Sequence, residues 1–132
     1  MARHVLLDTE LVLLLWDPHK SAVIMTRTEA ELPWELDDLR AFFESLVAAV
    51  GPINRPSNDF VIDARASMGR NDEAFETVKR EFESRLFGGF KNVSVVLLTE
   101  VGRLQVQRYN DDLSDQEMLV FPTVDDALDR PG

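Results

Sequence analysis

With 132 residues, the chain has the length of one domain, because about 100–200 residues usually form a single core. Its net charge of −10 disfavours nucleic acid and anionic membranes as partners, since both attract clustered positive charge. The absence of cysteine excludes disulfides and thiolate metal sites. The hydrophobic content of 45% is that of a folded protein, so we expect one globular domain over residues 1–132.

The first long apolar run, LVLLLW at residues 11–16, is too short to cross a membrane, which takes about 20 helical residues. The first residues also lack the basic, apolar and small-residue regions of a signal peptide. We therefore expect a cytoplasmic protein, and the lack of cysteine agrees with that compartment.

The first part of the chain predicts three strands and one helix. The strands are expected at residues 2–8, 11–17 and 21–27. The unbroken apolar run in the second of them is typical of a strand covered on both faces. The helix runs from Pro33 to Val50, because apolar residues recur three, four and seven positions apart. Gly51 and Pro52 end it, with Gly51 expected in the left-handed conformation.

The second part predicts strands that alternate with helices. A strand at residues 59–64 precedes an amphipathic helix at 71–87, which Asn71 or Asp72 can cap. A strand at 92–100 follows. The segment 103–111 fits either a strand or a short helix, and the helix suits the alternating order better. A last strand at 118–121 and a helical turn capped by Thr123 complete the chain.

This order predicts an α/β fold with a mixed sheet. The N-terminal strands are expected to be antiparallel, while the strand–helix–strand part is parallel with right-handed crossovers. In such sheets ligands and partners bind at the carboxyl ends of the parallel strands. The turn after the strand at 59–64, with sequence DARASMGRND at residues 63–72, lies at that edge.

Arginines near this edge make it the best candidate for a binding site. Arg65 and Arg70 flank the turn, and the end of the next strand brings Thr99, Gly102 and Arg103 near it if the two strands are neighbours. Arginines beside helix N–H donors bind carboxylates or phosphates well. Alternatively, the two turn arginines pair with Asp63, Asp72 or Glu76 and simply hold the loop. The residues predicted to bind a partner or an anion are Asp63, Arg65, Met68, Gly69, Arg70, Asn71, Asp72, Thr99, Arg103 and Arg108.

The distribution of charge allows the same two interpretations. Residues 29–44 and 111–129 are acidic, whereas most of the basic residues lie between 65 and 108. This pattern is either ordinary variation over a solvated surface or a basic patch focused on the predicted edge.

Three segments resemble the SpoIIAA-like (STAS/SEC14-like) domains: DARASMGRND, GFKNVSVVLLTEVGRLQVQRY at 89–109 and FPTVDDAL at 121–128. In particular the sequence looks like uncharacterised bacterial members that contain an RND motif, then a glycine–phenylalanine step, then G-R-L-Q-V-Q-R, and the resemblance covers about residues 5–128. It implies a SpoIIAA-like mixed sheet and a regulatory role. The superfamily fold supports several functions, so the fold is the more specific implication.

The phosphoserine switch of STAS domains is one implication that this chain does not match. In those domains a serine at the start of the helix after this strand is phosphorylated, and that position falls near Asn71 or Asp72 here. Ser67 lies earlier in the loop, out of register. SEC14-like lipid carriers enclose a larger apolar cavity, for which this chain is short.

Catalytic and metal-binding arrangements are weakly indicated. We expect Asp63 to accept hydrogen bonds from loop backbone and Asp72 to cap a helix, rather than to act as an acid–base pair. His4 and His19 have no metal-ligand spacing, and no nucleophile or phosphate-loop motif occurs. We therefore predict no enzyme activity, no metal and no cofactor.

Four aromatic residues are open to more than one interpretation. Trp16 and Trp34 are expected to pack in the core or at the start of the first helix, although an exposed Trp34 would suit a partner contact. Phe42 and Phe43 cannot share one helix face, so one is expected in the core and the other at its margin or at a subunit contact.

These observations predict a non-enzymatic regulatory module that binds a protein partner through residues 65–72 and 99–108. The partner can be a second copy of the chain, which would make the protein a homodimer. The alternative is a sensor that binds a nucleotide or phosphorylated metabolite at the same arginines. Neither nucleic acid nor a membrane is expected as a partner.

Overall fold

The computed structural model describes residues 3–66, 72–97 and 118–129, and it has a six-stranded mixed sheet. The strands lie side by side in the order of the sequence: β1 (His4–Asp8), β2 (Val12–Asp17), β3 (Ala22–Arg27), β4 (Asp59–Asp63), β5 (Val93–Val96) and β6 (Met118–Phe121). The first three strands pair antiparallel, and β3 to β6 pair parallel. The predicted mixed sheet is confirmed.

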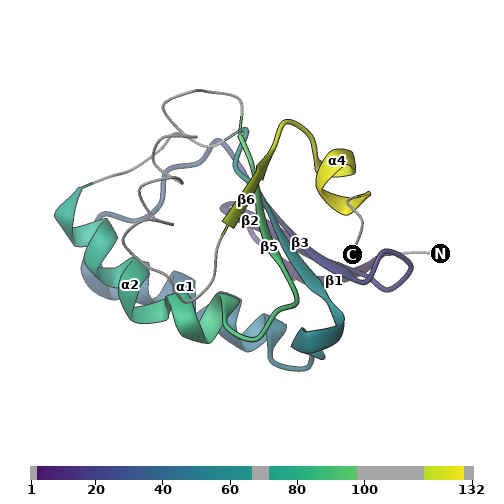
Figure 1. Cartoon of the computed structure of the whole chain (residues 1–132). Helices are drawn as coiled ribbons and strands as arrows, with labels where there is room; N and C mark the ends of the chain where they lie inside the picture. Colours follow the sequence, from purple (N-terminus) through teal and green to yellow (C-terminus); the bar gives the residue numbers. More distant parts are fainter. Residues whose placement is uncertain (1–2, 67–71, 98–117, 130–132) are drawn as a thin grey trace.

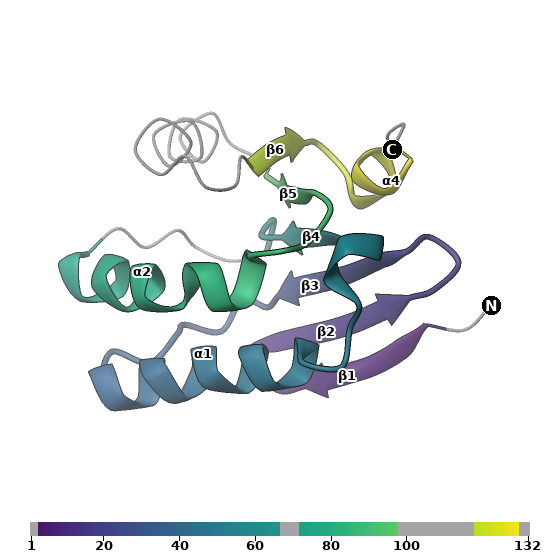
Figure 2. The same ribbon diagram turned by 60° about the horizontal axis from the view of Figure 1, so that its bottom comes forward.

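Two long helices cover one face of this sheet, and a short one lies on the other (Figure 1). Helices α1 (Leu36–Val50) and α2 (Glu73–Phe87) connect β3 to β4 and β4 to β5, since adjacent parallel strands need a crossover. The two long helices lie side by side in Figure 2, and α4 (Val124–Leu128) lies on the other side of the sheet from them. None of the helices within the described ranges is both long and apolar enough to cross a membrane.

The main hydrophobic core lies between the sheet and the two long helices. Fully buried side chains of the central strands, such as Phe60 and Val23, meet Leu39 and Leu86 of the helices. Phe60 contacts Phe87 and Phe90 edge to face, with ring centroids 5.2 and 5.0 Å away. The amphipathic stripes that predicted both helices are therefore the surfaces that they bury.

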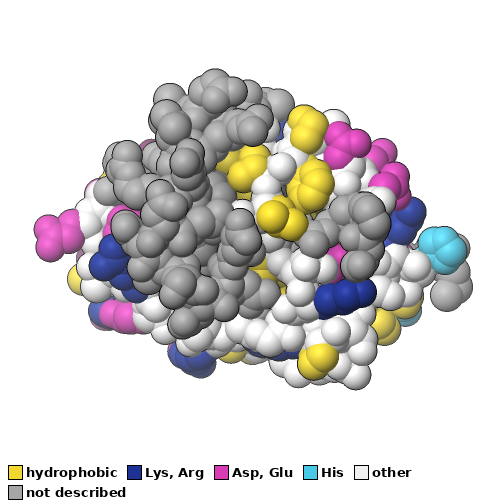
Figure 3. Space-filling view, viewed as in Figure 1, with side chains coloured by type: hydrophobic (Ala, Val, Ile, Leu, Met, Phe, Trp, Pro, Cys, Tyr) yellow, Lys and Arg dark blue, Asp and Glu magenta, His cyan; other side chains and the backbone are white. Residues whose placement is uncertain are grey.

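The opposite face of the sheet has a much smaller core. Ile24, Val61, Val96 and Ala127 form a buried cluster there, and α4 covers it. Hydrophobic and acidic side chains lie next to one another around α4 in Figure 3. Away from α4, Leu15 pairs in register with Ile24 and so belongs to this face, yet it is only half-buried. The expectation that residues 11–17 are fully covered on both faces is therefore wrong.

Both phenylalanines of the Phe42–Phe43 pair are buried, which corrects the prediction that one would lie at a margin. Phe43 stacks on Phe82 of α2, with 5.5 Å between ring centroids, while Phe42 lies under the guanidinium of Arg27. The prediction considered only a helix that packs on a sheet. Because α1 also packs against α2, its buried arc is wide enough for two consecutive rings.

The ends of α1 also differ from the prediction. The helix begins at Leu36, and Trp34 before it is 59% exposed, so the expected packing of Trp34 is not found. Gly51 has φ −51°, in the right-handed region, and its N–H donates to the carbonyl of Ala48. The helix ends in a tightened last turn followed by Pro52, without a left-handed glycine.

A short 3-10 helix (Arg55–Ser57) precedes β4 and was not predicted. Its Arg55 donates hydrogen bonds to the carbonyls of Arg85 and Gly88 at the end of α2, and its guanidinium lies 5.0 Å from the Phe90 ring centroid. These bonds satisfy backbone acceptors that a helix end leaves without partners.

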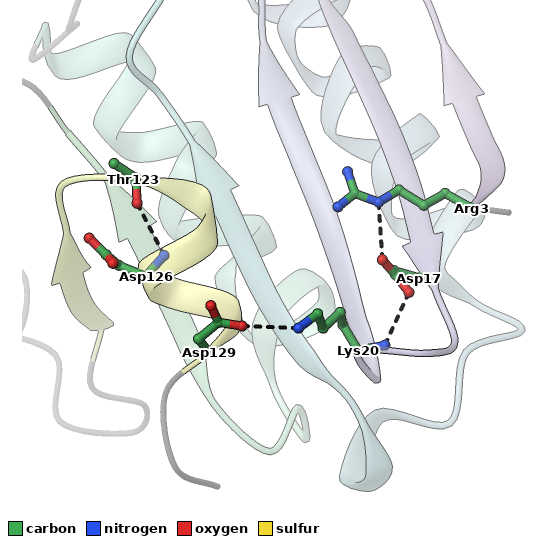
Figure 4. Close-up of polar contacts among 6 residues, drawn as sticks. All are labelled: Arg3, Asp17, Lys20, Thr123, Asp126 and Asp129. Atoms are coloured by element: carbon green, nitrogen blue, oxygen red, sulfur yellow. Dashed lines mark hydrogen bonds and ion pairs between the residues drawn. The ribbon is translucent and has the colours of Figure 1, made fainter. Parts of the chain in front are cut away.

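The turn between β2 and β3 is fixed by Asp17 and joined to the end of α4 (Figure 4). Asp17 accepts the backbone N–H of Lys20 and the Nε–H of Arg3, both at 3.0 Å. Lys20 Nζ in turn lies 3.0 Å from the carboxylate of Asp129. Thr123 accepts the N–H of Asp126, which confirms the predicted cap of the last helical turn.

Candidate functional site

The candidate site lies where β4 ends. Asp63 is the last residue of β4, and it is aligned in register with Thr26 on β3 and Val96 on β5. These parallel strands all end at the same edge, so the turn that starts at Ala64 leaves the sheet where binding sites of α/β folds occur. The predicted neighbourhood of the strand at 59–64 and the next strand is thus confirmed.

Arg65 is held by Asp63 through a bidentate contact. The Nε–H of Arg65 donates to Asp63 Oδ1 at 2.9 Å, and Nη2 donates to Oδ2 at 2.9 Å. The backbone N–H of Arg65 also donates to Oδ1, at 3.2 Å. The side chain of Asp63 is only 10% exposed, compared with 37% for Arg65. The interpretation in which Asp63 and Arg65 organise the loop is therefore confirmed for this pair.

The hydrogen bonds from Arg65 hold the pKa of Asp63 below its ordinary value, against the opposing effect of burial. The carboxylate is accordingly ionised at neutral pH. A general acid requires the opposite shift, because it must retain its proton near neutrality. The chemistry of Asp63 is that of a fixed acceptor and counterion.

One edge of the Arg65 guanidinium has no hydrogen-bond partner among the described residues. Asp63 engages Nε and Nη2, and Nη1 donates to none of the described residues. With a partly exposed side chain held in one orientation, Nη1 can present its N–H groups to an incoming oxygen without further ordering.

Asp72 forms the start of α2. Its Oδ2 accepts the backbone N–H of Phe75 at 3.2 Å, which confirms Asp72 as the capping residue. Glu73 and Glu76 add negative charge to the first turn, where the helix dipole favours it. Asp72 therefore has a sufficient structural role, as predicted.

The described basic residues between 65 and 97 do not form one surface. Arg85 lies in the last turn of α2, at the far end from Asp72, and forms a bidentate ion pair with Glu44 of α1. Lys79 lies 6.0 Å above the Phe75 ring centroid, in the middle of the helix. Of the described basic residues, Arg65 is the one at the end of β4.

Several predicted site residues lie outside the described residues, so the structure neither groups nor separates them. They are Met68, Gly69, Arg70, Asn71, Thr99, Arg103 and Arg108. The choice between helix and strand for 103–111 lies outside the described residues as well.

Sequence reasoning overlooked two arginines with structural roles. Arg27 is half-buried, and it donates to the carbonyls of Leu11 and Ala30, while Arg55 binds the end of α2. Burial lowers the pKa of both guanidinium groups. The position of Arg27 at the end of a predicted strand was the available signal, but only the fold shows which carbonyls it meets.

The two histidines lie on β1 and in the turn after β2. His4 stacks on Trp16 with 5.4 Å between ring centroids, and Trp16 donates its indole N–H to Asn58. Within residues 3–66, 72–97 and 118–129, no group of three or more His, Asp or Glu side chains could hold a metal ion.

Comparison with known proteins identifies the fold. No family model matches the chain, and no curated protein matches it. A solved structure of an uncharacterized protein of the DUF3478 family from Shewanella loihica PV-4, described as having a SpoIIAA-like fold, is similar with a TM-score of 0.60. The alignment covers 98% of this chain and 94% of that one at 15% sequence identity. Together with the mixed sheet and its helices, this match shows that the chain has a SpoIIAA-like fold.

Proposed function

We propose that this protein is a non-enzymatic regulatory module of the bacterial cytoplasm, which binds a protein partner through residues 65–72 and 99–108. The observation that supports it best is the Asp63–Arg65 pair, which fixes a partly exposed guanidinium at the carboxyl edge of the sheet. The RND motif at 70–72 and G-R-L-Q-V-Q-R at 102–108 resemble motifs of bacterial SpoIIAA-like proteins, and in this proposal both contribute to the same edge.

In this proposal an acidic group of the partner accepts hydrogen bonds from Nη1 of Arg65. The partner's acidic group would thus bind one edge of the guanidinium, while the other edge is already bound to Asp63. Because Asp63 orients the arginine beforehand, little side-chain entropy is lost on binding. Arg70, Arg103 and Arg108 are expected to add charge at the same edge, and Met68 to add apolar contact area.

The two carboxylates of the turn, Asp63 and Asp72, are the reason why the proposed function is not a catalytic one. Asp63 has a lowered pKa and binds Arg65, and Asp72 accepts the backbone N–H of Phe75. Each therefore has a role that an exchangeable catalytic proton would disrupt.

Affinity capture with matched variants tests the proposal. We would compare the wild type, Arg65→Gln, Arg70→Glu and Arg40→Gln as baits in a bacterial lysate and identify retained proteins by mass spectrometry. Arg40 is the control, because it forms a similar bidentate pair with Glu81 on the outer surface of α1 and α2. A protein retained by the wild type and by Arg40→Gln, but lost from the other two baits, supports the proposal. Equal retention by all four baits contradicts it.

Light scattering of the purified protein tests the homodimer form of the proposal. If a second copy is the partner, the wild type and Arg40→Gln have the mass of a dimer, and Arg65→Gln has the mass of a monomer. The same mass for all three proteins excludes self-association through Arg65.

The alternative is that the same guanidinium binds a small anion. It is favoured by the position of Arg65 between a strand end and the turn that leads to α2, where phosphate groups commonly bind. A ligand at a hundredfold excess over Kd would raise the free energy of unfolding by about 2.7 kcal/mol. A thermal-shift panel of nucleotides and sugar phosphates measures this, and a shift that Arg65→Gln abolishes would favour the anion over a protein.

A further inference from the structure

The face of the sheet opposite α1 and α2 is covered only in part. Helix α4 packs mainly on β4, β5 and β6, and in Figure 2 it lies near the β6 end of the sheet, away from β1. On β1 and β2 the apolar side chains that point to this face are Val5, Leu13 and Leu15, because Val12 and Leu14 point into the main core. These three residues are here called the open patch.

The open patch is apolar where a strand that faces water is ordinarily polar. A strand with one solvated face alternates apolar and polar residues, whereas β2 has leucine on both faces. Leu13 and Leu15 are half-buried, and Val5, which lies in register with Leu15, is 61% exposed. Adjacent apolar side chains that remain in contact with water are typical of a surface that binds another protein.

The backbone of β1 indicates how another chain would approach this patch. Strand β1 is an edge strand, and its register with β2 shifts between Val5 and Leu7. An irregularity of this kind at an edge disfavours the addition of a further strand. A chain that covers the open patch is therefore expected to pack on the face of the sheet, as the two sheets of a sandwich do.

Opposite charges lie at the two ends of the open patch. Arg3 donates its Nε–H to Asp17 at 3.0 Å (Figure 4), and its two Nη groups donate to none of the described residues. Asp17 lies on the same face as Leu15, two residues before it in the strand. At the other end Asp8 lies in register with Leu13, and its exposed carboxylate forms no ion pair with a described residue.

We propose that a second copy of this chain covers the open patch, face to face, about a twofold axis that runs across the strands. Such an axis reverses the strand direction, so Arg3 of each copy meets Asp8 of the other, with Val5 and Leu15 between the two contacts. A twofold interface must be self-complementary in this way, because each contact occurs twice. The Nη groups of Arg3 can bind a second carboxylate while Nε stays on Asp17.

Analytical ultracentrifugation of the purified protein from about 1 μM to 1 mM, the range of weak specific binding, measures this self-association. The mass should rise from that of one chain to that of two. Leu15→Thr should raise the dissociation constant about tenfold, because it places a hydroxyl at the centre of the interface. Val5→Thr should raise it as well, at an exposed position where folding is not at risk. Leu36→Ser, at another exposed apolar position, is the control and should change it less than about twofold.

Charge variants test the orientation of the two copies. Asp8→Lys places a cation opposite Arg3 of the other copy, and Arg3→Glu places a carboxylate opposite Asp8, so each variant alone should associate about tenfold more weakly. In an equimolar mixture opposite charges meet at both contacts, so the dimer should return. Circular dichroism checks that Arg3→Glu, which loses its bond to Asp17, is folded.

The control for net charge is Glu31→Lys, an exposed position on another part of the surface. It changes the charge by the same amount as Asp8→Lys. Because the protein carries a net charge of −10, either change alone reduces the repulsion between copies and favours association. The weakening expected for Asp8→Lys is therefore opposite in sign to the effect of net charge.

Three results would overturn the inference. They are the mass of a single chain at every concentration, a dimer that Leu15→Thr and Val5→Thr leave unchanged, and a mixture of the charge variants that stays monomeric. A dimer that Arg65→Gln retains and Leu15→Thr loses assigns the contact to the open patch and not to the turn. The inference is thus independent of the proposed function, because capture of another protein through Arg65 is measured separately.

Discussion

The two faces of the sheet differ in how much they bury and in what they expose. Between the sheet and the helices α1 and α2, aromatic and aliphatic side chains from both helices and from β2 to β6 form one continuous core. The other face buries a cluster of four residues under the five-residue α4. Asp63 belongs to this second face, because it alternates with Ile62 of the main core and lies two residues after Val61.

Because the two faces differ in this way, one face can stabilise the fold while the edge of the other carries the candidate binding site. The helix-covered face supplies most of the hydrophobic free energy of folding, so the second face can carry a charged pair at its edge at little cost to stability. Helix α1 is divided in a similar way, because its buried face packs on the sheet and on α2 while Trp34 and Leu36 at its start are exposed.

The largest expected effect comes from removing Phe60, the largest fully buried side chain of the main core. Phe60→Ala should lower the free energy of unfolding by about 3–5 kcal/mol, because it deletes contacts with Phe87 and Phe90 and leaves a cavity. Urea unfolding followed by circular dichroism measures the loss.

Val23 and Val61 allow a matched comparison between the two faces, since both side chains are fully buried on neighbouring strands. The side chain of Val23 faces the two long helices, and that of Val61 faces α4. We expect Val23→Ala to cost more than Val61→Ala, because the short α4 can shift to fill the space. Equal costs would show that α4 holds its face as firmly as the long helices hold theirs.

Arg65→Gln should lower the free energy of unfolding by about 1–3 kcal/mol at neutral pH, since it leaves the buried carboxylate of Asp63 without its cation. The folded-state pKa of Asp63 lies below the unfolded one, so this stabilisation is complete above the ordinary aspartate pKa. It is lost as the pH falls through the folded-state pKa. The deficit of the variant should therefore shrink in acid, which urea unfolding at several pH values would show. A deficit that does not depend on pH would mean that Arg65 stabilises by packing.

Sequence periodicity was sufficient for most of the fold. The apolar stripe of residues 71–87 and the alternating strands identified the elements, because each has one dominant buried surface. Two incorrect predictions concern the helix α1, which packs against two neighbouring elements, and Trp34, which is exposed before that helix. Phe42 and Phe43 are both buried because α1 packs against both the sheet and α2. Trp34 is exposed, although a tryptophan at the start of a helix was expected to be packed.

The candidate site was predicted less completely than the fold. The sequence placed Asp63 and Arg65 in the right turn and identified Asp72 as a capping residue, since both features follow from a strand that leads to a helix. It could not show that Arg85 pairs with Glu44 or that Arg55 binds the end of α2, because these contacts join residues 30 or more positions apart. Charge counted along the chain therefore does not separate Arg85, at the far end of α2, from Arg65 at the turn.

A smaller effect is expected at the helix starts. Asp72→Ala should lower the free energy of unfolding by about 1 kcal/mol, because the N–H of Phe75 loses its acceptor. Glu35→Ala should have almost no effect, since Glu35 makes no capping hydrogen bond. Thermal unfolding of the two variants measures the contrast. If Glu35→Ala is as costly as Asp72→Ala, Glu35 stabilises the start of α1 by another interaction than a capping hydrogen bond.

The smallest effect is expected from Lys20→Gln, which removes the ion pair with Asp129 at the edge of the second face. Both side chains are largely exposed, and solvent and salt screen such pairs. The melting temperature should fall slightly at low ionic strength and not at all in high salt. Arg40→Gln, which removes the exposed pair with Glu81, is the control on the other face. If Lys20→Gln alone lowers the melting temperature in high salt as well, Lys20 does more than pair with Asp129. It then anchors α4 to the sheet, and the second face is held in place from its edge.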